Sequence, residues 1–314
     1  MAANIPHYKL NNGKELPLVG FGTFKGHSGN EEVYEATKTS LKEGYRFIDT
    51  AYIYETEEAV GNAVRDSGVP REEVFVLSKL WQNFHEPQHV KPVFERSLKN
   101  FGFDYLDCYI MHWPMAWEFK GYEFKDVGTF RGQQDVKCID VPIIDTWREM
   151  EKLVDEGLVE TIGVSNFTIS MLEDLLKEAR IPPAVNEVEL HPSLPQQELV
   201  DYCAKKNIAL IAYSPIGNPG YHNNHMKITE EPKIIEIAEK YNISTYQLLL
   251  NYGVSRNYAV IPKSVTPSRI KANIQYVKID DEDIKTITEV GLKHPIRTCS
   301  PLKMFGPSNN IFNE

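Results

Sequence analysis

The sequence is poor in cysteine and contains neither a long apolar run nor a cluster of basic residues. Only four cysteines occur in 314 residues. They are widely spaced and include no CxxC pair, so we expect neither a disulfide framework nor a zinc site. No apolar stretch approaches the roughly 18 residues that span a bilayer. The 34 basic and 44 acidic residues give a net charge of −10, which argues against nucleic acid and anionic membranes as partners.

The chain also has no sign of a secretory signal, an internal linker or an interface motif. Its first residues, MAANIPHYKL, show no cationic flank followed by an apolar core. With 42% hydrophobic and 25% charged residues, the composition is that of an ordinary globular protein. We expect one domain over residues 1–314, located in the cytoplasm as a monomer or weak homodimer. His222 and His225 have ligand-like spacing but no third ligand nearby, so we expect no metal.

Eight short apolar segments alternate with amphipathic helical segments. This alternation indicates an α/β fold with a parallel sheet and crossover helices. Eight such units without a break favour a single closed (β/α)8 TIM barrel over an open sheet. The expected strands are residues 19–22, 46–49, 74–80, 105–112, 159–164, 184–190, 209–213 and 259–262. The expected helices are residues 31–43, 57–67, 89–101, 144–156, 169–178, 196–205 and 245–254.

Two further expectations concern the ends of the barrel. Residues 8–10 and 15–18 flank an Asn-Gly turn, which predicts an N-terminal β-hairpin. Residues 113–142, 217–231 and 291–314 are too long and polar to be simple turns. We expect them to form long loops at the carboxyl-terminal face, where a barrel carries its chemistry.

Four titratable residues fall where successive expected strands end. Asp49 ends the second strand and Tyr54 follows it, Lys79 lies near the end of the third strand, and His112 ends the fourth. Taken singly, each has an ordinary structural reading as a helix cap, a solvated charge, a core histidine or a packed aromatic. Because the spacing follows the βα repeat, we expect all four to converge at one mouth of the barrel and to form a catalytic site.

The chemistry of this set points to a carbonyl group. A tyrosine hydroxyl is a reluctant acid, with an ordinary pKa near 10. We expect the Lys79 ammonium to lower the pKa of Tyr54 and make it a better proton donor, with Asp49 orienting Lys79. A neutral His112 would donate to a carbonyl oxygen as negative charge develops there. The set supplies no reductant, so a cofactor must bring the hydride.

Three segments resemble the signatures of the aldo-keto reductase family. The first is Gly44-Tyr45-Arg46-Phe47-Ile48-Asp49-Thr50-Ala51 with Tyr54 and Glu57. The second is Gly163-Val164-Ser165-Asn166-Phe167, and the third runs from Ile261-Pro262-Lys263-Ser264 to Arg269-Ile270. Together with Lys79-Leu80-Trp81 and His112-Trp113-Pro114, they span almost the whole chain. The branch of aldose, aldehyde and xylose reductases is the most similar, with fungal sugar or glycerol reductases as expected relatives.

The resemblance implies NADPH or NADP+ as the cofactor, with NADH disfavoured, and a role for each matching residue. Tyr54 resembles the proton donor, Lys79 and Asp49 its tuning pair, and His112 the substrate-orienting residue. Ser165, Asn166, Glu187 and Tyr213 match the residues around the nicotinamide. The other implied cofactor contacts are Gly22, Thr23, Phe24, Ser214, Ile216, Asn218, Lys263, Ser264, Val265, Thr266, Arg269 and Asn273. The implied substrate pocket consists of Phe24, Trp81, Trp113, Cys299 and Leu302.

Three positions depart from this family pattern. Glu187 stands where relatives carry Gln, and a buried carboxylate there would be costly unless it were neutral or paired. Ala272 replaces a common Glu beside Asn273 and loses a hydrogen-bond acceptor. Phe24 stands where many relatives have Trp. We expect these departures to change affinity and specificity rather than the class of reaction.

The resulting expectation is an enzyme that reduces aldehydes or ketones, such as xylose or glyceraldehyde, to alcohols. Two alternatives stay open from the sequence. Lys79 at a barrel strand end could be the nucleophile of a Schiff-base aldolase, although an adjacent Asp49 would raise the pKa of that lysine. The barrel could instead bind NADP(H) without catalysis, as a regulatory or structural protein.

Overall fold

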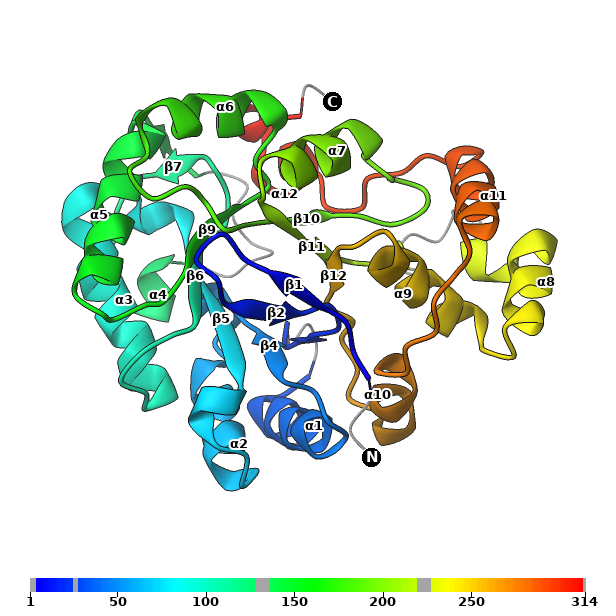
Figure 1. Ribbon diagram of the computed structural model, residues 1–314. Helices are drawn as coiled ribbons and strands as arrows, with labels where there is room; N and C mark the ends of the chain where they lie inside the picture. Colours follow the sequence, from blue (N-terminus) through cyan, green and yellow to red (C-terminus); the bar gives the residue numbers. More distant parts are fainter. Residues whose placement is uncertain (1–3, 25–27, 128–135, 219–226, 313–314) are drawn as a thin grey trace.

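A ring of eight parallel strands forms the centre of the molecule (Figure 1). The computed structural model describes residues 4–24, 28–127, 136–218 and 227–312. In order around the sheet, the strands are β3 (Phe21–Gly22), β4 (Phe47–Asp49), β5 (Phe75–Leu80), β6 (Cys108–Met111), β9 (Ile162–Ser165), β10 (Val185–Glu189), β11 (Ala209–Tyr213) and β12 (Ala259–Val260). Nearly every strand residue is buried, as expected for parallel strands covered on both faces.

The ring closes between its first and last strands. Val19 forms a parallel bridge with Val260. The amide of Gly20 donates to the carbonyl of Val260 at 2.8 Å, and the amide of Val260 donates to the carbonyl of Leu18 at 3.0 Å. The sequence-based prediction of a (β/α)8 barrel is therefore confirmed, with a shorter first strand than expected.

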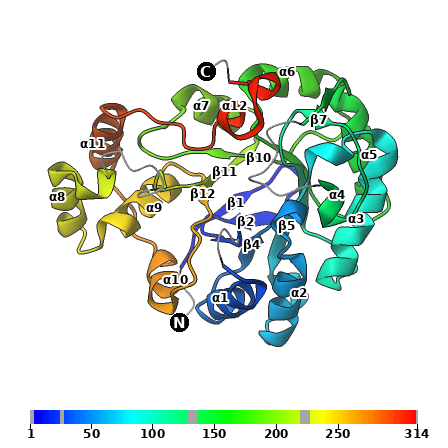
Figure 2. The same ribbon diagram turned by 180° about the vertical axis from the view of Figure 1, so that it is seen from behind.

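Helices surround the ring on its outside, as the view from behind also shows (Figure 2). The helices that follow the strands are α1 (Asn30–Lys42), α2 (Glu57–Asp66), α3 (Pro87–Phe101), α5 (Ile143–Asp155), α6 (Ile169–Glu178), α7 (Gln197–Lys205), α9 (Thr245–Ser255) and α10 (Pro267–Asn273). Each turns an apolar stripe toward the strands; α5, for example, buries Trp147, Met150 and Leu153 completely. All seven predicted helices are present.

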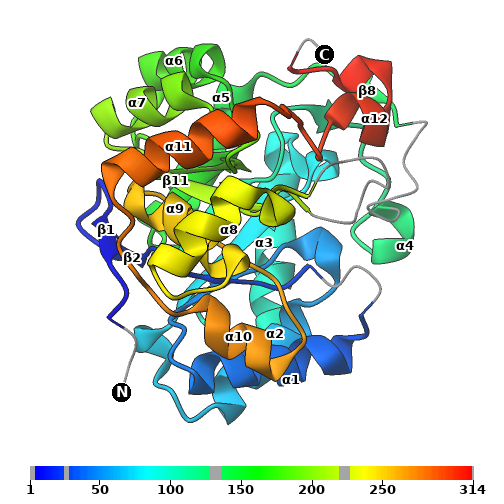
Figure 3. The same cartoon turned by 90° about the vertical axis from the view of Figure 1, so that its right-hand side faces the viewer.

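The predicted hairpin covers the amino-terminal end of the barrel. Strands β1 (His7–Lys9) and β2 (Glu15–Pro17) pair antiparallel. The turn between them includes Gly13 at φ +87°, a conformation that favours glycine. Leu10 and Leu16 are buried beneath the hairpin. In side view, the hairpin lies at one end of the barrel and α12 (Pro301–Phe305) lies at the other (Figure 3).

The structure contains elements that the sequence reading assigned to loops or did not name. Residues 113–142 include the short antiparallel strands β7 (Ala116–Trp117) and β8 (Cys138–Ile139) and the helix α4 (Phe124–Val127). Residues 291–314 include α12, so the long loops expected in both segments carry short elements that the sequence analysis did not name. Helices α8 (Pro232–Lys240) and α11 (Asp281–Leu292) pack with α9 around a second apolar cluster that includes Ile234, Leu248 and Ile287.

The contact between α2 and α3 generates a stability prediction. Gly61 lies where α2 meets the end of α3, and a Cβ placed there would overlap the backbone carbonyl of Phe101. We expect Gly61→Ala to lower the free energy of unfolding by about 1–2 kcal/mol, because the cost of overpacking exceeds the gain in helix propensity. Urea denaturation measures this change. Gly29→Ala, which meets open space, is the matched control, and equal stability of the two variants would contradict the packing argument.

Candidate active site

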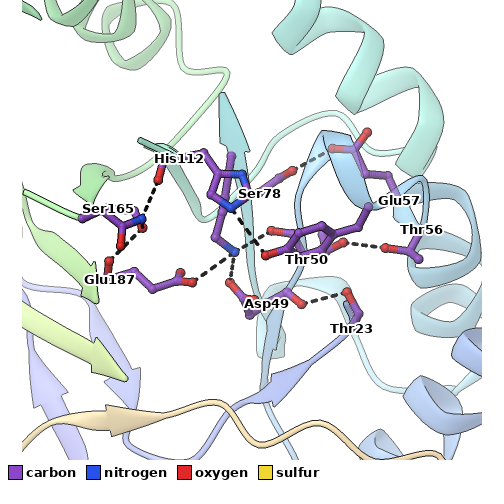
Figure 4. A network of polar contacts seen from close by, with 12 residues as sticks. Thr23, Asp49, Thr50, Thr56, Glu57, Ser78, His112, Ser165 and Glu187 are labelled. Carbon is purple, nitrogen blue, oxygen red and sulfur yellow. Dashed lines mark hydrogen bonds and ion pairs between the residues drawn. The ribbon is translucent and has the colours of Figure 1, made fainter. Parts of the chain in front are cut away.

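The structure brings the four titratable residues of the sequence analysis together at the carboxyl ends of neighbouring strands. Asp49 ends β4, Lys79 lies near the end of β5, and His112 follows β6 directly. Strand β5 pairs with β4 on one side and with β6 on the other. Tyr54 ends a single 3₁₀ turn, η1 (Tyr52–Tyr54), between β4 and α2. Figure 4 shows Asp49 and His112 in this polar network.

Lys79 is held by a fully buried ion pair. Its ammonium donates to Asp49 Oδ2 and to the carbonyl of Thr50, the latter at 2.9 Å, and none of the Lys79 side chain is exposed. The hydroxyl of Thr23 donates to the backbone carbonyl of Asp49 at 2.8 Å. Burial alone would lower the pKa of Lys79, but Asp49 and Glu187 together raise it above its ordinary value. Lys79 is therefore an ammonium at neutral pH.

Glu187 is a third ionisable member of this group, which we call the Lys79 cluster (Asp49, Lys79 and Glu187). Its Oε1 lies 3.4 Å from Lys79 Nζ, and its side chain is only 3% exposed. Burial, together with the charge of Asp49, raises the pKa of Glu187 well above its ordinary value. Burial also raises the pKa of Asp49, with Lys79 opposing this rise. The sequence analysis predicted that Glu187 contacts the nicotinamide carboxamide; in the structure its carboxyl group contacts the Lys79 ammonium.

Tyr54 and His112 face one another beside the cluster. Tyr54 Oη lies 3.5 Å from His112 Nε2, and Lys79 Nζ lies 5.4 Å from the centre of the Tyr54 ring. Burial and the charge of Lys79 hold the pKa of His112 well below its ordinary value, so the imidazole is neutral. Burial raises the pKa of Tyr54 above its ordinary value even though Lys79 opposes this rise. Lys79 thus lowers the pKa of Tyr54 as expected, but desolvation outweighs this effect and the net shift is upward.

Ser165, Asn166 and Tyr213 form a second polar group next to His112. The Asn166 amide donates to the carbonyl of His112 at 2.9 Å and to Ser165 Oγ at 3.0 Å. The hydroxyl of Tyr213 donates to Asn166 Oδ1 at 2.7 Å, and Ser165 Oγ donates to the carbonyl of Glu187 at 2.7 Å. Asn166 has φ +63°, a strained value that these bonds stabilise. The group therefore has a fixed geometry beside His112.

The remaining predicted cofactor contacts lie around the ends of β11, β12 and β3. Ser214 and Asn218 both have positive φ, and the Asn218 amide donates to Ser214 Oγ at 3.0 Å. The amide of Gly22 donates to the carbonyl of Pro262 at 3.1 Å, which brings the first strand end beside the last. The others in this region are Phe24, Ile216, Lys263, Ser264, Val265, Thr266, Arg269 and Asn273. The ends of β11, β12 and β3 thus adjoin one another where the barrel closes, and Arg269 and Asn273 lie on α10, which follows β12.

Two cations that follow β12 form no ion pair with a described residue, although the charge of Glu32 acts on Lys263 from a longer distance. No described carboxylate lies within 4.0 Å of Lys263 or Arg269; the ammonium of Lys263 donates only to Ser28 Oγ, at 3.3 Å. Partial desolvation lowers the pKa of Lys263, although the residue as a whole is exposed. A phosphate would supply the missing counter-charge, so the chemistry of these residues fits a phosphorylated cofactor.

The predicted substrate-pocket residues come from the mouth and from the C-terminal segment, defined here as residues 296–312. The Trp81 ring contacts the His112 ring edge-to-face, with centroids 5.0 Å apart, and Phe24 contacts Tyr54 in the same way at 5.0 Å. Trp113 packs against Phe305 of the C-terminal segment. Cys299 and Leu302 lie in that segment and are partly buried. All four cysteines have free thiols.

Glu189 anchors the C-terminal segment, a role that the sequence analysis did not predict. Its carboxylate accepts hydrogen bonds from His191 Nε2 at 2.9 Å, from the amide and hydroxyl of Thr298 at 2.7 Å each, and from the amide of Cys299 at 2.8 Å. The Asn218 amide donates to the same Thr298 hydroxyl at 3.2 Å. The sequence contained a signal for this role of Glu189. Glu187 and Glu189 are two residues apart on one strand, so their side chains lie on the same, inward face.

A cavity of about 730 Å³ lies between the beginnings of α6 and α7 and the C-terminal segment. It is lined by residues that include Phe167, Gln196, Arg297 and Phe312, and none of the four convergent residues lines it.

Among residues 4–24, 28–127, 136–218 and 227–312, no group of three or more His, Cys, Asp or Glu side chains is arranged to hold a metal. His222 and His225 lie outside the described residues. No described helix is both long and apolar enough to cross a membrane.

Comparison with known proteins identifies relatives over the whole chain. The model of the Aldo/keto reductase family matches residues 18–291. "Glycerol 2-dehydrogenase (NADP(+))" of Hypocrea jecorina is 39% identical over 309 residues, covering 95% of this chain and 96% of that protein. "NAD(P)H-dependent D-xylose reductase" of Pachysolen tannophilus is 41% identical, covering 91% and 93%. The solved structure of the aldose reductase from Schistosoma japonicum matches with a TM-score of 0.88 at 35% identity, covering 99% of each chain.

The anchoring by Glu189 generates a prediction for the C-terminal segment. In the wild type, the carboxylate of Glu189 accepts from N–H and O–H donors. In Glu189→Gln, the side-chain NH2 would face one of these donors and could not accept from it. We expect the free energy of unfolding to fall by about 2 kcal/mol, since hydrogen bonds to charged groups contribute about 1.5–3 kcal/mol each. Hydrogen exchange at the amides of Thr298 and Cys299 should accelerate at neutral pH. Glu198→Gln, an exposed change on α7, is the control.

The pH dependence of this effect follows from the pKa of Glu189. Burial would raise that pKa, but the hydrogen bonds and charge of His191 and the bonds from Thr298 lower it below its ordinary value. The carboxylate therefore contributes stability above its unfolded pKa of about 4.3. This contribution is lost as the pH falls through the lower folded value. A stability difference between wild type and Glu189→Gln that grows on acidification would contradict this assignment.

Proposed function

This chain belongs to the aldo/keto reductase family, and on that premise we propose that it reduces aldehydes and ketones to alcohols with NADPH as the reductant. The observation that carries the proposal is the meeting of a protonated Tyr54 and a neutral His112 beside the buried ammonium of Lys79. Aldoses such as xylose and short hydroxy-aldehydes such as glyceraldehyde are the proposed substrates. The relatives named for glycerol and D-xylose support this substrate class.

Each residue has a distinct role in the proposed mechanism. The substrate carbonyl oxygen lies between Tyr54 Oη and His112 Nε2, where both groups donate hydrogen bonds to it as negative charge develops. Tyr54 then transfers its proton to that oxygen, and the Lys79 ammonium stabilises the phenolate that remains. Asp49 keeps Lys79 charged and fixes its position. NADPH, when bound, supplies the hydride that this set of side chains cannot provide.

The residues of the mouth are proposed to hold the cofactor. Ser165 and Asn166 would bind the nicotinamide carboxamide, with the face of Tyr213 against the ring. Lys263 and Arg269 would neutralise the 2′-phosphate, since neither forms an ion pair within the described part of the chain. A phosphate at this position explains a preference for NADPH over NADH.

The two alternatives are less well supported. A Schiff-base aldolase needs a neutral lysine, whereas Asp49 and Glu187 raise the pKa of Lys79. A non-catalytic NADP(H)-binding barrel would need neither the Lys79–Asp49 pair nor Tyr54 beside it. We also place the protein in the cytoplasm, where a reducing environment would keep its four thiols free, as a monomer or weak homodimer.

The decisive test follows NADPH absorbance with glyceraldehyde, xylose and a bulky ketone. We expect carbonyl-dependent oxidation of NADPH by the wild type. In Tyr54→Phe, kcat/KM should fall by about 10²–10⁴-fold, the usual contribution of a positioned acid, while NADPH binding by fluorescence stays unchanged. Tyr246→Phe makes the same change at an exposed site and should have no effect. Near-normal turnover by Tyr54→Phe would overturn the mechanism.

Cofactor preference has its own prediction. Arg269→Ala should weaken NADPH binding by about 10–100-fold, because a charge-assisted hydrogen bond contributes about 1.5–3 kcal/mol. NADH binding should stay the same, since that cofactor lacks the 2′-phosphate. Lys271→Ala removes an equal charge from the same short helix, α10, and is the matched control. An equal loss for both cofactors in Arg269→Ala would place this arginine away from the phosphate.

A further inference from the structure

The Lys79 cluster contains two carboxyl groups and only one ammonium. Lys79, Asp49 and Glu187 have side-chain exposures of 0%, 4% and 3%. If both carboxyl groups were ionised, the interior would carry an unbalanced negative charge, which is strongly unfavourable away from water. One retained proton makes the cluster neutral. A carboxyl pair that shares one proton is a familiar solution to this problem.

The geometry points to Glu187 as the group that holds this proton. Asp49 accepts directly from Lys79, whereas Glu187 Oε1 lies farther from the ammonium, at 3.4 Å. Glu187 Oε2 is buried and accepts no hydrogen bond from a donor among the described residues. A full negative charge on this oxygen would have no such donor to stabilise it, and burying an unpaired charge costs more than burying a neutral carboxyl group.

We propose that Glu187 is a positioning residue that keeps a proton inside the Lys79 cluster at neutral pH and loses it in alkaline solution, which weakens proton donation by Tyr54. This inference rests on the proposed function. When Glu187 ionises, its proton passes to solvent and the cluster gains one negative charge. That charge adds to the forces that keep the Tyr54 hydroxyl protonated, and it also competes for the ammonium that would otherwise stabilise the phenolate.

The titratable groups around Glu187 come from other strands of the barrel and from η1. Lys79 on β5 is the cation that favours ionisation of Glu187, and the raised pKa of Glu187 reports that burial and Asp49 prevail over Lys79. The titratable groups whose charges interact with Glu187 are Asp49 on β4, Tyr54 on η1, Lys79 on β5, Cys108 on β6 and Tyr213 on β11. Only Lys79 among them is positive.

The experiment compares wild type with Glu187→Gln, which has nearly the same shape and cannot ionise. Because Glu187 is also one of the implied nicotinamide contacts, the readout is the shape of the pH profile: kcat/KM for glyceraldehyde at saturating NADPH is expressed for each protein relative to its own value at neutral pH. In alkaline solution, kcat/KM of the wild type should fall toward a slope of about tenfold per pH unit, as one ionisation requires. Glu187→Gln should lack this fall or show it only at higher pH.

Glu57→Gln is the matched control. Glu57 on α2 is also buried and accepts from Ser78 Oγ at 2.7 Å and from Asn100 Nδ2 at 2.9 Å. It makes no ion pair with Lys79 in the described part of the chain. We expect its variant to keep the alkaline fall of the wild type. An unchanged alkaline fall in Glu187→Gln would overturn the inference.

Infrared spectroscopy of the protein without cofactor gives a second readout that does not depend on turnover. A protonated carboxyl group has a C=O stretch separate from that of a carboxylate. The difference spectrum between wild type and Glu187→Gln should contain this band at neutral pH and lose it in alkali; a carboxylate band already present at neutral pH would refute the inference. If the wild type reduced no carbonyl at any pH, the proposed function would fail, while the infrared result would still report the proton on Glu187.

Discussion

The ammonium of Lys79 inside the barrel wall is the constraint on which the candidate site depends. A cation without hydration requires an opposite charge in contact, and Asp49 provides it from the neighbouring strand. Burial together with this cation lowers the pKa of His112 and keeps it neutral, and the cation lies over the ring of Tyr54. Parallel pairing of β4, β5 and β6 makes this arrangement possible, because it places three strand ends side by side. The fold thus supplies the electrostatics of the site as well as its shape.

Much of the fold could be predicted from the sequence, because the strands and most helices have strong local signals. Strand β5 is apolar along most of its length, and the Asn-Gly turn marks the hairpin. The missed elements are short or depend on distant contacts: β7 and β8 have two residues each and pair only with one another. Helix α11 had an overlooked local signal, since Asp280 precedes three acidic residues in its first turn.

The positions of the site residues were predictable from the repeat, but their ionisation was not. Spacing alone indicated that Asp49, Lys79 and His112 would meet. The direction of the Tyr54 shift depends on how desolvation compares with the charge of Lys79, and that balance requires the three-dimensional surroundings. The anchoring role of Glu189 was missed because three of its four hydrogen-bond donors come from residues 298 and 299, far along the chain. The fourth donor comes from residue 191.

The hairpin at the end of the barrel opposite the candidate site determines from which face a ligand reaches that site. Strands β1 and β2 cover the amino-terminal end, and Leu10, Leu16 and Leu18, in or next to the hairpin, are buried. Because side chains fill the interior of such a barrel and the hairpin covers its amino-terminal end, the carboxyl-terminal face serves as both entrance and exit of the site. Under the proposed function, a product therefore leaves past the C-terminal segment, whose Thr298 is bound to Glu189 at that face.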